Sequence, residues 1–326
     1  MHNHLISVII CAYNEGTNIK QCLKSLGAQT ENNYELIIVD DGSNNNDPSI
    51  KIMDKYEQEH LNTTVIHKKN GGSISARMSG VKNANGQYIT FIDADDFVSA
   101  NYIKTIHNIV SNNTADLYQL NNKLNKKGTK DFEVEKKFLV DGSSIAITKM
   151  YQWVLTGKAG AVWDKIYRRD LFPNINSPIF YGEDVFININ YLKNVNSIVT
   201  IDKAIYYHIS DSTTSGSVTG KSYKKFFDID DLYIFVKRLR IDSIINDETF
   251  ERFVQVYLTN IAHGTGDLYR LGIKKQKITS LLNQLSIVND CLTSIKPQSL
   301  KKQVYIWCLK KKLYSLMSLI DKVVRN

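Results

Sequence analysis

Three clusters of acidic and polar side chains occur in the first hundred residues: Cys11-Ala12-Tyr13-Asn14-Glu15, Asp40-Asp41-Gly42-Ser43 and Asp93-Ala94-Asp95-Asp96. One such cluster has a simple structural explanation, because carboxylates at turns commonly cap helices or close Asx-turns. Carboxylates gathered at one place raise one another's pKa unless a cation or hydrogen-bond donors lie among them. Three clusters together therefore indicate a site for a hard divalent metal ion that carries a phosphate ester.

Each cluster follows a predicted strand. Leu5–Ala12, Glu35–Val39 and Gln87–Ile92 are short apolar runs, typical of strands covered on both faces of a parallel sheet. Thr64–His67 is a further short strand. This alternation predicts a doubly wound α/β sheet, whose ligands bind beyond the carboxyl ends of the strands. The helical segments between these strands are Asn14–Gln29, Pro48–Glu59 and Ser73–Ala84.

The rest of the chain changes character near residue 220. Ala115–Asp202 is less regular and contains a predicted hairpin around Asn125–Asp131 and a helix near Ser143–Thr156. From Lys221 onward the pattern is helical, so we predict an α/β domain over residues 1–220 and a helical region over residues 221–326. The four segments with helical periodicity are Tyr223–Leu239, Asp247–His263, Lys275–Leu292 and Ser299–Val324.

Net charge is concentrated at one end of the chain. The 41 basic and 33 acidic residues give +8, and Lys296–Asn326 alone holds eight basic residues against Asp321. The remainder carries only +1, whereas a nucleic-acid-binding protein would spread positive charge over a groove. We therefore expect no nucleic-acid partner.

The last segment also carries an apolar stripe at 3-4 spacing: Ile306, Leu309, Leu313, Leu316, Ile320 and Val323. Two interpretations stay open. This helix packs on its own domain or on a second subunit, or it attaches the protein to the anionic inner face of the cell membrane.

Cysteine usage and the N-terminus predict a cytoplasmic protein. Cys11, Cys22, Cys291 and Cys308 show no CxxC spacing, as expected of thiols kept reduced. The first residues lack a basic leader with an apolar run and a cleavage site, and no stretch approaches the roughly 20 apolar residues of a membrane span.

Several segments resemble, in order and spacing, the motifs of family 2 glycosyltransferases with the GT-A fold. They are SVIICAYNE, ELIIVDDGS and GGSISARMSGVKNANGQYITFIDADD, and the acceptor-side segments AVWDKIYRRDLF, YGEDVF and IYYHISDSTT. The resemblance covers Ser7–Thr214. It implies a Rossmann-like, mixed but mostly parallel sheet flanked by helices, with a nucleotide-binding half over about 1–100 and an acceptor half over about 101–220.

On the donor side, the resemblance implies contacts to a UDP-sugar. Tyr13 would stack on the uracil, and Asp41 would accept its N3 hydrogen, which cytosine lacks. Arg77 would hold the base or a carboxylate at the rim, because its fork suits bidentate contacts. A core tyrosine and simple ion pairing are the alternatives for Tyr13 and Arg77. The remaining expected donor-site residues are Ala12, Glu15, Asp93 and Ala94.

The resemblance also implies a manganese or magnesium ion. Asp93 would lie near the ribose and metal-bound water, and Asp95 would bind the metal directly, although Asp96 makes this register ambiguous. His208 resembles a position that completes the metal or diphosphate site in some relatives. The metal would bridge the two phosphates and stabilise the departing diphosphate.

On the acceptor side, the Asp of the Glu183-Asp184 pair matches the family's general base. Asp184 would take the proton of the acceptor hydroxyl, and Glu183 would orient the acceptor. Trp163 would offer a ring to a sugar face and Lys165 a charge to phosphate, with a core tryptophan and a surface lysine as the alternatives.

The sequence thus predicts an inverting, metal-dependent hexosyl- or N-acetylhexosaminyltransferase. It would move a sugar from a UDP-sugar to a hydroxyl of a glycan, a wall or capsule polymer, or a glycoprotein. Two alternatives stay open. FIDADDF resembles the aspartate-nucleophile motif of haloacid-dehalogenase-like phosphatases, without a later GDxxxD, and a non-catalytic carbohydrate-binding protein could use the same fold.

Overall fold

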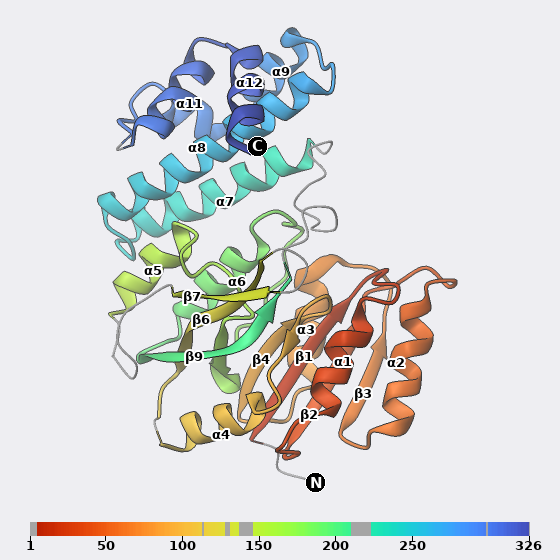
Figure 1. Cartoon of the computed structure of the whole chain (residues 1–326). Helices are drawn as coiled ribbons and strands as arrows, with labels where there is room; N and C mark the ends of the chain where they lie inside the picture. Colours follow the sequence, from red (N-terminus) through yellow and green to blue (C-terminus); the bar gives the residue numbers. More distant parts are fainter. Residues whose placement is uncertain are drawn as a thin grey trace. The chain divides into compact units, whose positions relative to one another are not determined.

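We describe a computed structural model of the chain, which covers residues 5–112, 114–127, 131–136, 146–209, 223–297 and 299–325 (Figure 1). The chain divides into two compact units. The N-terminal unit comprises Met1–Met150, Gly157–Pro178 and Glu183–Asp211, and the C-terminal unit comprises Tyr151–Thr156, Ile179–Gly182 and Ser212–Asn326. The C-terminal unit therefore begins before residue 221 and also includes two short internal segments of the predicted first domain. A division of the N-terminal unit into nucleotide and acceptor halves stays a prediction.

The first four predicted strands are confirmed and form the parallel part of one sheet. Their order is β3 (Thr63–His67), β2 (Tyr34–Asp40), β1 (Ile6–Ala12) and β4 (Tyr88–Asp93). Right-handed crossovers place α1 and α2 on one face of these strands and α3 on the other. These helices are α1 (Ile19–Gly27), α2 (Pro48–Glu59) and α3 (Gly72–Asn83).

The second part of the sheet is mixed. β8 (Lys165–Arg168) pairs antiparallel with β4 and with β6 (Leu117–Lys127), and β6 pairs parallel with β9 (Ile198–His208). β5 (Phe97–Val98) then pairs antiparallel with β9. Because β5 begins four residues after β4 ends, this last pairing brings β9 back toward the end of β4.

Other elements of this region agree with the sequence in outline. β7 (Asp131–Lys136) pairs antiparallel with β6, which confirms the predicted hairpin. The helix expected near Ser143–Thr156 is found as α5 (Ile147–Leu155), while residues 143–145 lie outside the described residues. The remaining elements are α4 (Tyr102–Asn112), the 3-10 turn η1 (Arg169–Leu171) and α6 (Glu183–Leu192).

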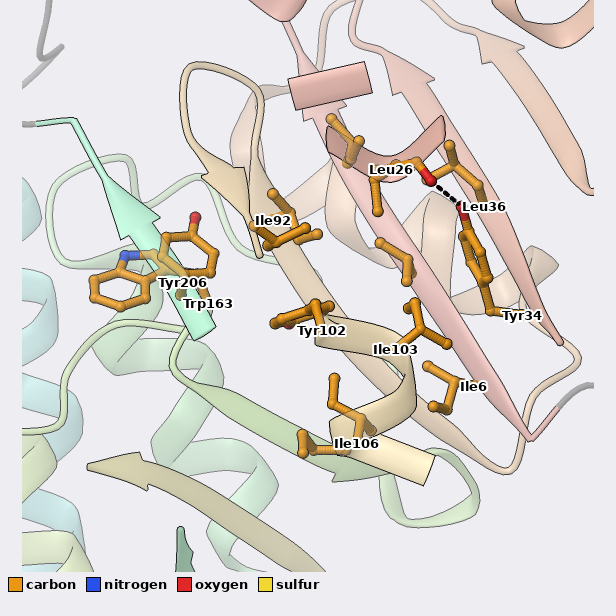
Figure 2. Packing of buried hydrophobic residues seen from close by; sticks show 14 of the residues in the cluster. Ile6, Leu26, Tyr34, Leu36, Ile92, Tyr102, Ile103, Ile106, Trp163 and Tyr206 are labelled. Atoms are coloured by element: carbon orange, nitrogen blue, oxygen red, sulfur yellow. Dashed lines mark hydrogen bonds between the residues drawn. The ribbon is translucent and has the colours of Figure 1, made fainter. Parts of the chain in front are cut away.

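Buried apolar side chains fix the sheet against α1 and α4 (Figure 2). Tyr34 at the start of β2 packs in this cluster, and its hydroxyl donates to the Leu26 carbonyl of α1 over 2.9 Å. Trp163 and Tyr206 stack with their ring centroids 4.6 Å apart. The core therefore extends to β9. This packing holds the carboxyl ends of β4 and β9 in fixed positions.

The C-terminal unit confirms the predicted helical region but not all of its helices. The described helices are α7 (Lys224–Ile241), α8 (Asp247–Arg270), α9 (Lys275–Leu282), α10 (Ser286–Cys291), α11 (Leu300–Lys310) and α12 (Tyr314–Arg325). The single helices expected over Lys275–Leu292 and Ser299–Val324 are wrong, because each is two helices. The second breaks where Lys312 takes a left-handed φ of 55° and Leu313 N–H donates to the Cys308 carbonyl, a helix-ending geometry.

The break also corrects the predicted apolar stripe. Ile306 and Leu309 are buried in the C-terminal unit, whereas Leu316 is 39% exposed on the next helix. These residues therefore do not form one continuous face. The interpretation in which the segment packs on its own domain is confirmed for the buried faces of α11 and α12.

Helix α3 lies unusually close to β1 at Gly80, one turn after Arg77. A Cβ at this position would overlap Cγ2 of Ile9, which is buried in β1. We predict that Gly80→Ala lowers the free energy of unfolding by about 1–3 kcal/mol through overpacking. Helix propensity alone would change it by up to about 1 kcal/mol in the opposite direction.

Urea unfolding checks the sign, with Lys82→Ala at an exposed position of the same helix as the control. A stabilised Gly80→Ala variant would contradict the close approach of α3 to β1.

Candidate active site

The three polar clusters meet at one edge of the sheet, as expected. Ala12 pairs with Asp40 across β1 and β2, and Cys11 pairs with Asp93 across β1 and β4. The parallel register therefore places the residues that follow these strands next to one another. This edge forms the floor of the candidate active site.

A single buried arginine joins this edge to the Glu183-Asp184 pair. Arg77 is 7% exposed on α3, and its Nη2 lies 3.5 Å from Oδ1 of Asp93. Its Nη1 lies 3.0 Å from Oδ1 of Asp184 and 3.8 Å from Oε1 of Glu183. Burial alone would lower the pKa of Arg77, but the carboxylates of Asp184 and Asp93 outweigh it and hold the pKa above its ordinary value. The guanidinium is therefore a permanent cation among three carboxylates.

Asp184, at the start of α6, is held from two sides. Besides the ion pair of Oδ1 with Arg77, its Oδ2 accepts a hydrogen bond from the Val162 N–H at 3.2 Å. The following turns of α6 are anchored by Asn188, which accepts from the Tyr167 hydroxyl and donates to the Gly160 carbonyl. The carboxylate of Asp184 is therefore positioned by a helix that is itself fixed to the sheet.

Carboxylates outnumber cations at this edge, and their pKa values respond. Burial, followed by repulsion from Asp184, raises the pKa of both Asp93 and Glu183, and Arg77 opposes these shifts only in part. Burial, followed by repulsion from Asp95 and Asp93, raises the pKa of Glu15 to about 7. Burial also raises the pKa of Asp95. A divalent cation would relieve this repulsion.

The donor set fits a hard metal ion that a substrate helps to bind. In the described residues no three His, Cys, Asp or Glu side chains gather closely enough to enclose a metal. Magnesium, however, is commonly held by one or two carboxylates together with substrate phosphates. Asp95 and Asp93 offer such oxygen ligands at the edge of the sheet.

Asp96 has a different part from its two neighbours, which the sequence left ambiguous. It is 1% exposed, its Oδ2 accepts from the Tyr206 hydroxyl at 2.7 Å, and its Oδ1 accepts from the Ile209 N–H at 2.7 Å. Tyr206 in turn accepts from the Asp93 N–H at 3.1 Å. Asp96 thus ties β9 to the end of β4, which places His208 at the same edge.

Asp41 is more heavily engaged than the sequence suggested. Its carboxylate accepts from Lys68 Nζ, from Gly71 N–H at 3.0 Å and from Gly72 N–H at 2.8 Å. It therefore anchors the start of α3 and lies beside Ala12 at the candidate active site. Sequence reasoning missed Lys68, whose only signal was its place directly after β3. The neighbouring Asp40 closes the turn by accepting from Ser43 N–H and pairing with His67.

The other expected donor-side residues differ in what they expose. Tyr13 is 49% exposed, so its ring is accessible from solvent. Ala12 and Ala94 are 2% and 3% exposed, which leaves them only main-chain groups to offer a ligand. Glu15 is half-buried beside the same edge.

Trp163 lies in the core, as the core-tryptophan alternative expected, whereas Lys165 is buried and fits neither a surface lysine nor a charge offered to phosphate. Trp163 is 6% exposed and stacks on both Tyr206 and His208, with ring centroids 4.6 and 5.4 Å apart. Lys165 is fully buried, and its Nζ donates to the carbonyls of Ala159 and Ala161 and pairs with Asp164. The interpretation of Lys165 as a surface lysine is wrong, and its ammonium fixes the loop before β8.

Residues 7–179 match the family described as Glycosyl transferase family 2. The chain belongs to this family. Among its relatives are the uncharacterized glycosyltransferase EpsJ of Bacillus subtilis, 28% identical over 69% of this chain and 65% of EpsJ, and the glycosyltransferase GlyG of Streptococcus pneumoniae, 38% identical over 35% of this chain and 38% of GlyG. This chain therefore matches 65% of the length of EpsJ and 38% of the length of GlyG. Membership of this family favours the glycosyltransferase interpretation over the phosphatase alternative.

The fold agrees with that of solved structures of S. aureus TarS. Residues 1–349 of S. aureus TarS superpose with a TM-score of 0.63, at 19% identity over 98% of this chain and 91% of the TarS chain. The complex of that protein with UDP-GlcNAc superposes with a TM-score of 0.64. The likeness confirms the GT-A fold with a helical C-terminal region. None of the helices in the described residues is long and apolar enough to cross a bilayer.

The raised pKa of Glu15 predicts a pH effect on stability. A folded-state pKa of about 7, against an ordinary value of 4.5, means that the folded protein holds this proton more tightly than the unfolded chain. The contribution is present below pH 4.5 and is lost as the pH rises toward 7. The difference in stability between Glu15→Gln and the wild type, measured in buffer without divalent ions, is therefore expected to shift in favour of the variant when the pH rises from 4.5 to 8.

Urea midpoints at the two pH values measure this change, and Glu59→Gln, an exposed change on α2, is the control. Equal differences between wild type and variant at both pH values would contradict the raised pKa of Glu15.

Proposed function

We propose that this family 2 glycosyltransferase transfers a hexose or N-acetylhexosamine from a UDP-sugar to an acceptor hydroxyl, with inversion at the anomeric carbon. The observation that supports this most is the position of Arg77, which contacts Asp93 and Asp184 at once. A carboxylate suited to take a proton thus lies one side chain away from the edge where a nucleotide diphosphate would bind. Direct displacement requires a base and a leaving group within one site.

The donor would bind at the edge of β1, β2 and β4. The exposed ring of Tyr13 would cover the uracil, and Asp41 would accept the N3 hydrogen with the lone pair that its three donors leave. Glu15, Asp93 and the main chain at Ala12 and Ala94 would line the ribose and the phosphates. The complexes of S. aureus TarS with UDP-GlcNAc and with UDP support a uridine nucleotide by analogy.

A manganese or magnesium ion would be held by Asp95, with Asp93 beside it and His208 as a further candidate on β9. When bound, the ion would supply Lewis-acid stabilisation of the diphosphate that leaves. Tyr206 and Asp96 keep β9 at this edge. Trp163 contributes by stacking on His208 and so orienting the imidazole.

Transfer itself would depend on Asp184. The acceptor oxygen attacks the anomeric carbon and passes its proton to the Asp184 carboxylate, while the bond from that carbon to the diphosphate oxygen breaks and UDP leaves with the electron pair. Arg77 and the Val162 N–H hold the carboxylate during this step. Glu183 would orient the acceptor, and the loop fixed by Lys165 would border it.

We propose an acceptor of the glycan, wall or capsule polymer, or glycoprotein class, and a cytoplasmic enzyme attached to the inner membrane face. The attachment surface would be the outward sides of α11 and α12. Their exposed apolar residues are Leu300, Trp307, Leu316 and Leu319, and their exposed lysines are Lys301, Lys310, Lys311, Lys312 and Lys322. Tryptophan and leucine flanked by lysines suit an anionic lipid surface, to which each basic residue adds about 1 kcal/mol. Pairing with a second copy through the same helices is the competing interpretation.

The roles of Asp184 and Asp41 predict opposite defects. Asp184→Asn should bind UDP nearly as the wild type does, while its transfer rate at saturating donor and acceptor falls by about 10²–10⁴. Asp41→Ala should weaken UDP binding before it impairs chemistry. Calorimetry with UDP beside steady-state transfer separates the two. If Asp184→Asn keeps most of its rate, the base lies elsewhere, and if it loses UDP binding, Glu183 and Asp184 belong to the donor site.

The metal assignment predicts that Asp95→Asn abolishes turnover. Chelation with EDTA should silence the wild type until manganese or magnesium is restored. Asp242→Asn, at an exposed position of the C-terminal unit, is the matched control and should turn over normally. Full activity of the wild type in excess EDTA would overturn the metal site.

Membrane attachment predicts that the protein floats with phosphatidylglycerol vesicles and that Trp307→Ser with Leu319→Ser abolishes flotation. Truncation at Lys296 is unsuitable, because it would remove buried core residues such as Tyr305 and Met317. Leu61→Ser with Ile241→Ser removes exposed apolar side chains elsewhere and is the control. Equal flotation of both variants would remove the proposal, and a concentration-dependent dimer lost only in the first variant would favour the second copy.

A further inference from the structure

A groove between α1 and α2 lies outside the candidate active site. It is open to solvent, has a volume of about 740 Å³, and is lined by residues that include Lys20 and Lys24 of α1 and Lys51, Lys55, Tyr56 and Glu59 of α2. Both helices follow parallel strands on the same face of the sheet, so they run in the same direction. None of these residues has a part in the chemistry proposed above.

Lysines line both walls of this groove. Lys20 and Lys24 lie four residues apart on α1, and Lys51 and Lys55 lie four residues apart on α2, so each pair shares one helix face with about 6 Å between its members. All four are exposed. Glu59 is the one acidic residue among the described residues that line the groove, and it lies 3.6 Å from Lys55.

The lining of this groove carries more positive charge than is usual for this part of the chain. Outside Lys296–Asn326 the chain carries a net charge of only +1. Four lysines and one glutamate line the groove, while Asp54 and Glu57 of α2 are not among the lining residues. The positive charge is therefore concentrated at the groove itself. Placing four cations beside one another costs energy that a bound polyanion would recover.

The floor of the groove is apolar, and its aromatic ring already has a stacking partner. Leu23 is buried, and the ring of Tyr56 stacks on His60 with centroids 3.8 Å apart and an interplanar angle of 9°. Because that ring already has a stacking partner, it is poorly suited to receive a nucleobase. The floor suits the carbon skeleton of a chain whose charges lie along its sides.

A second hollow of about 560 Å³ continues the surface on the other side of α1. It shares Lys20, Lys24 and Ala28 with the groove and reaches Phe97. Phe97 directly follows Asp96, which anchors β9 at the candidate active site. The lysine-bearing surface therefore extends from α2 across α1 to the segment that follows the metal-site aspartates.

We propose that the groove between α1 and α2 binds a linear polyanionic glycan, a chain whose phosphodiester or carboxylate charges recur along its length. Facing rows of lysines match such a chain, whereas a flat lipid surface contacts convex faces rather than a groove between helices. The inference deepens the proposed function, on which it rests for the role of the chain as acceptor. The groove would retain the polymer while one of its units occupies the active site.

The test uses the full chain and long-chain inorganic polyphosphate as the probe. Lys20→Glu with Lys51→Glu reverses one lysine on each wall, at early helix positions where an acidic side chain is compatible with the helix dipole. We expect at least a 10-fold weaker Kd, and a slope of log K against log salt reduced by about 1 or more. Lys82→Glu with Lys104→Glu makes the same charge change at exposed positions of α3 and α4 and should weaken binding less than 2-fold.

Three results would overturn the proposal: a wild type that does not bind polyphosphate, equal losses in the two double variants, and no loss in the groove variant. Phosphatidylglycerol vesicles are the comparison probe, and a loss confined to vesicles would assign the lysines to a membrane instead. UDP calorimetry on each protein keeps this test separate from the proposed function. If the proteins bind UDP but the groove variant binds polyphosphate as tightly as the wild type does, the groove proposal alone is wrong. If the wild type does not bind UDP, the assignment of the UDP-sugar site alone is wrong.

Discussion

The buried guanidinium of Arg77 is the interaction on which the arrangement of the site depends. It must remain charged in a poorly solvated place, and the carboxylates of Asp93 and Asp184 make that charge favourable. Removing either partner would leave a buried charge without its counter-ion, which costs more than the pair itself contributes. The sheet edge and the start of α6 are therefore coupled through one side chain.

The rest of the N-terminal unit can be understood as support for that side chain. Gly80 lets α3 lie close against β1, and Asp41 fixes the first turn of the same helix through Gly71 and Gly72. At the opposite side, Asp96 and Tyr206 hold β9 against the end of β4. The excess of carboxylates that results is unfavourable for the protein alone, and it suits a cation that arrives with a diphosphate.

The local pattern of apolar and polar residues predicted most of the secondary structure. Three of the four parallel strands, β1, β2 and β4, have nearly continuous apolar, β-branched runs, and such runs need both faces covered, so these strands were predictable. The mixed part of the sheet was not, because the pairing of β5 with β9 joins segments more than a hundred residues apart. Helical periodicity also hid the breaks at Asn283–Leu285 and Lys311–Leu313, since an apolar pattern continues across a short turn.

For the site, sequence identified the residue types but not their neighbours. Asp93, Asp95 and Asp184 could be chosen from motifs, whereas the use of Asp96 as an anchor depends on a tyrosine from a distant strand. The burial of Lys165 could not be predicted from the sequence. A lysine is rarely buried, yet here two carbonyls and Asp164 satisfy its ammonium inside the fold.

The most direct test of the central claim is a double-mutant cycle on the rate of sugar transfer at saturating donor and acceptor. If Arg77 acts by holding the general base, Arg77→Met should cost much rate in the wild type and little more once Asp184→Asn is present. Strongly non-additive losses are the predicted result. Losses that multiply independently would show that Arg77 serves the reaction without Asp184 and would contradict the account.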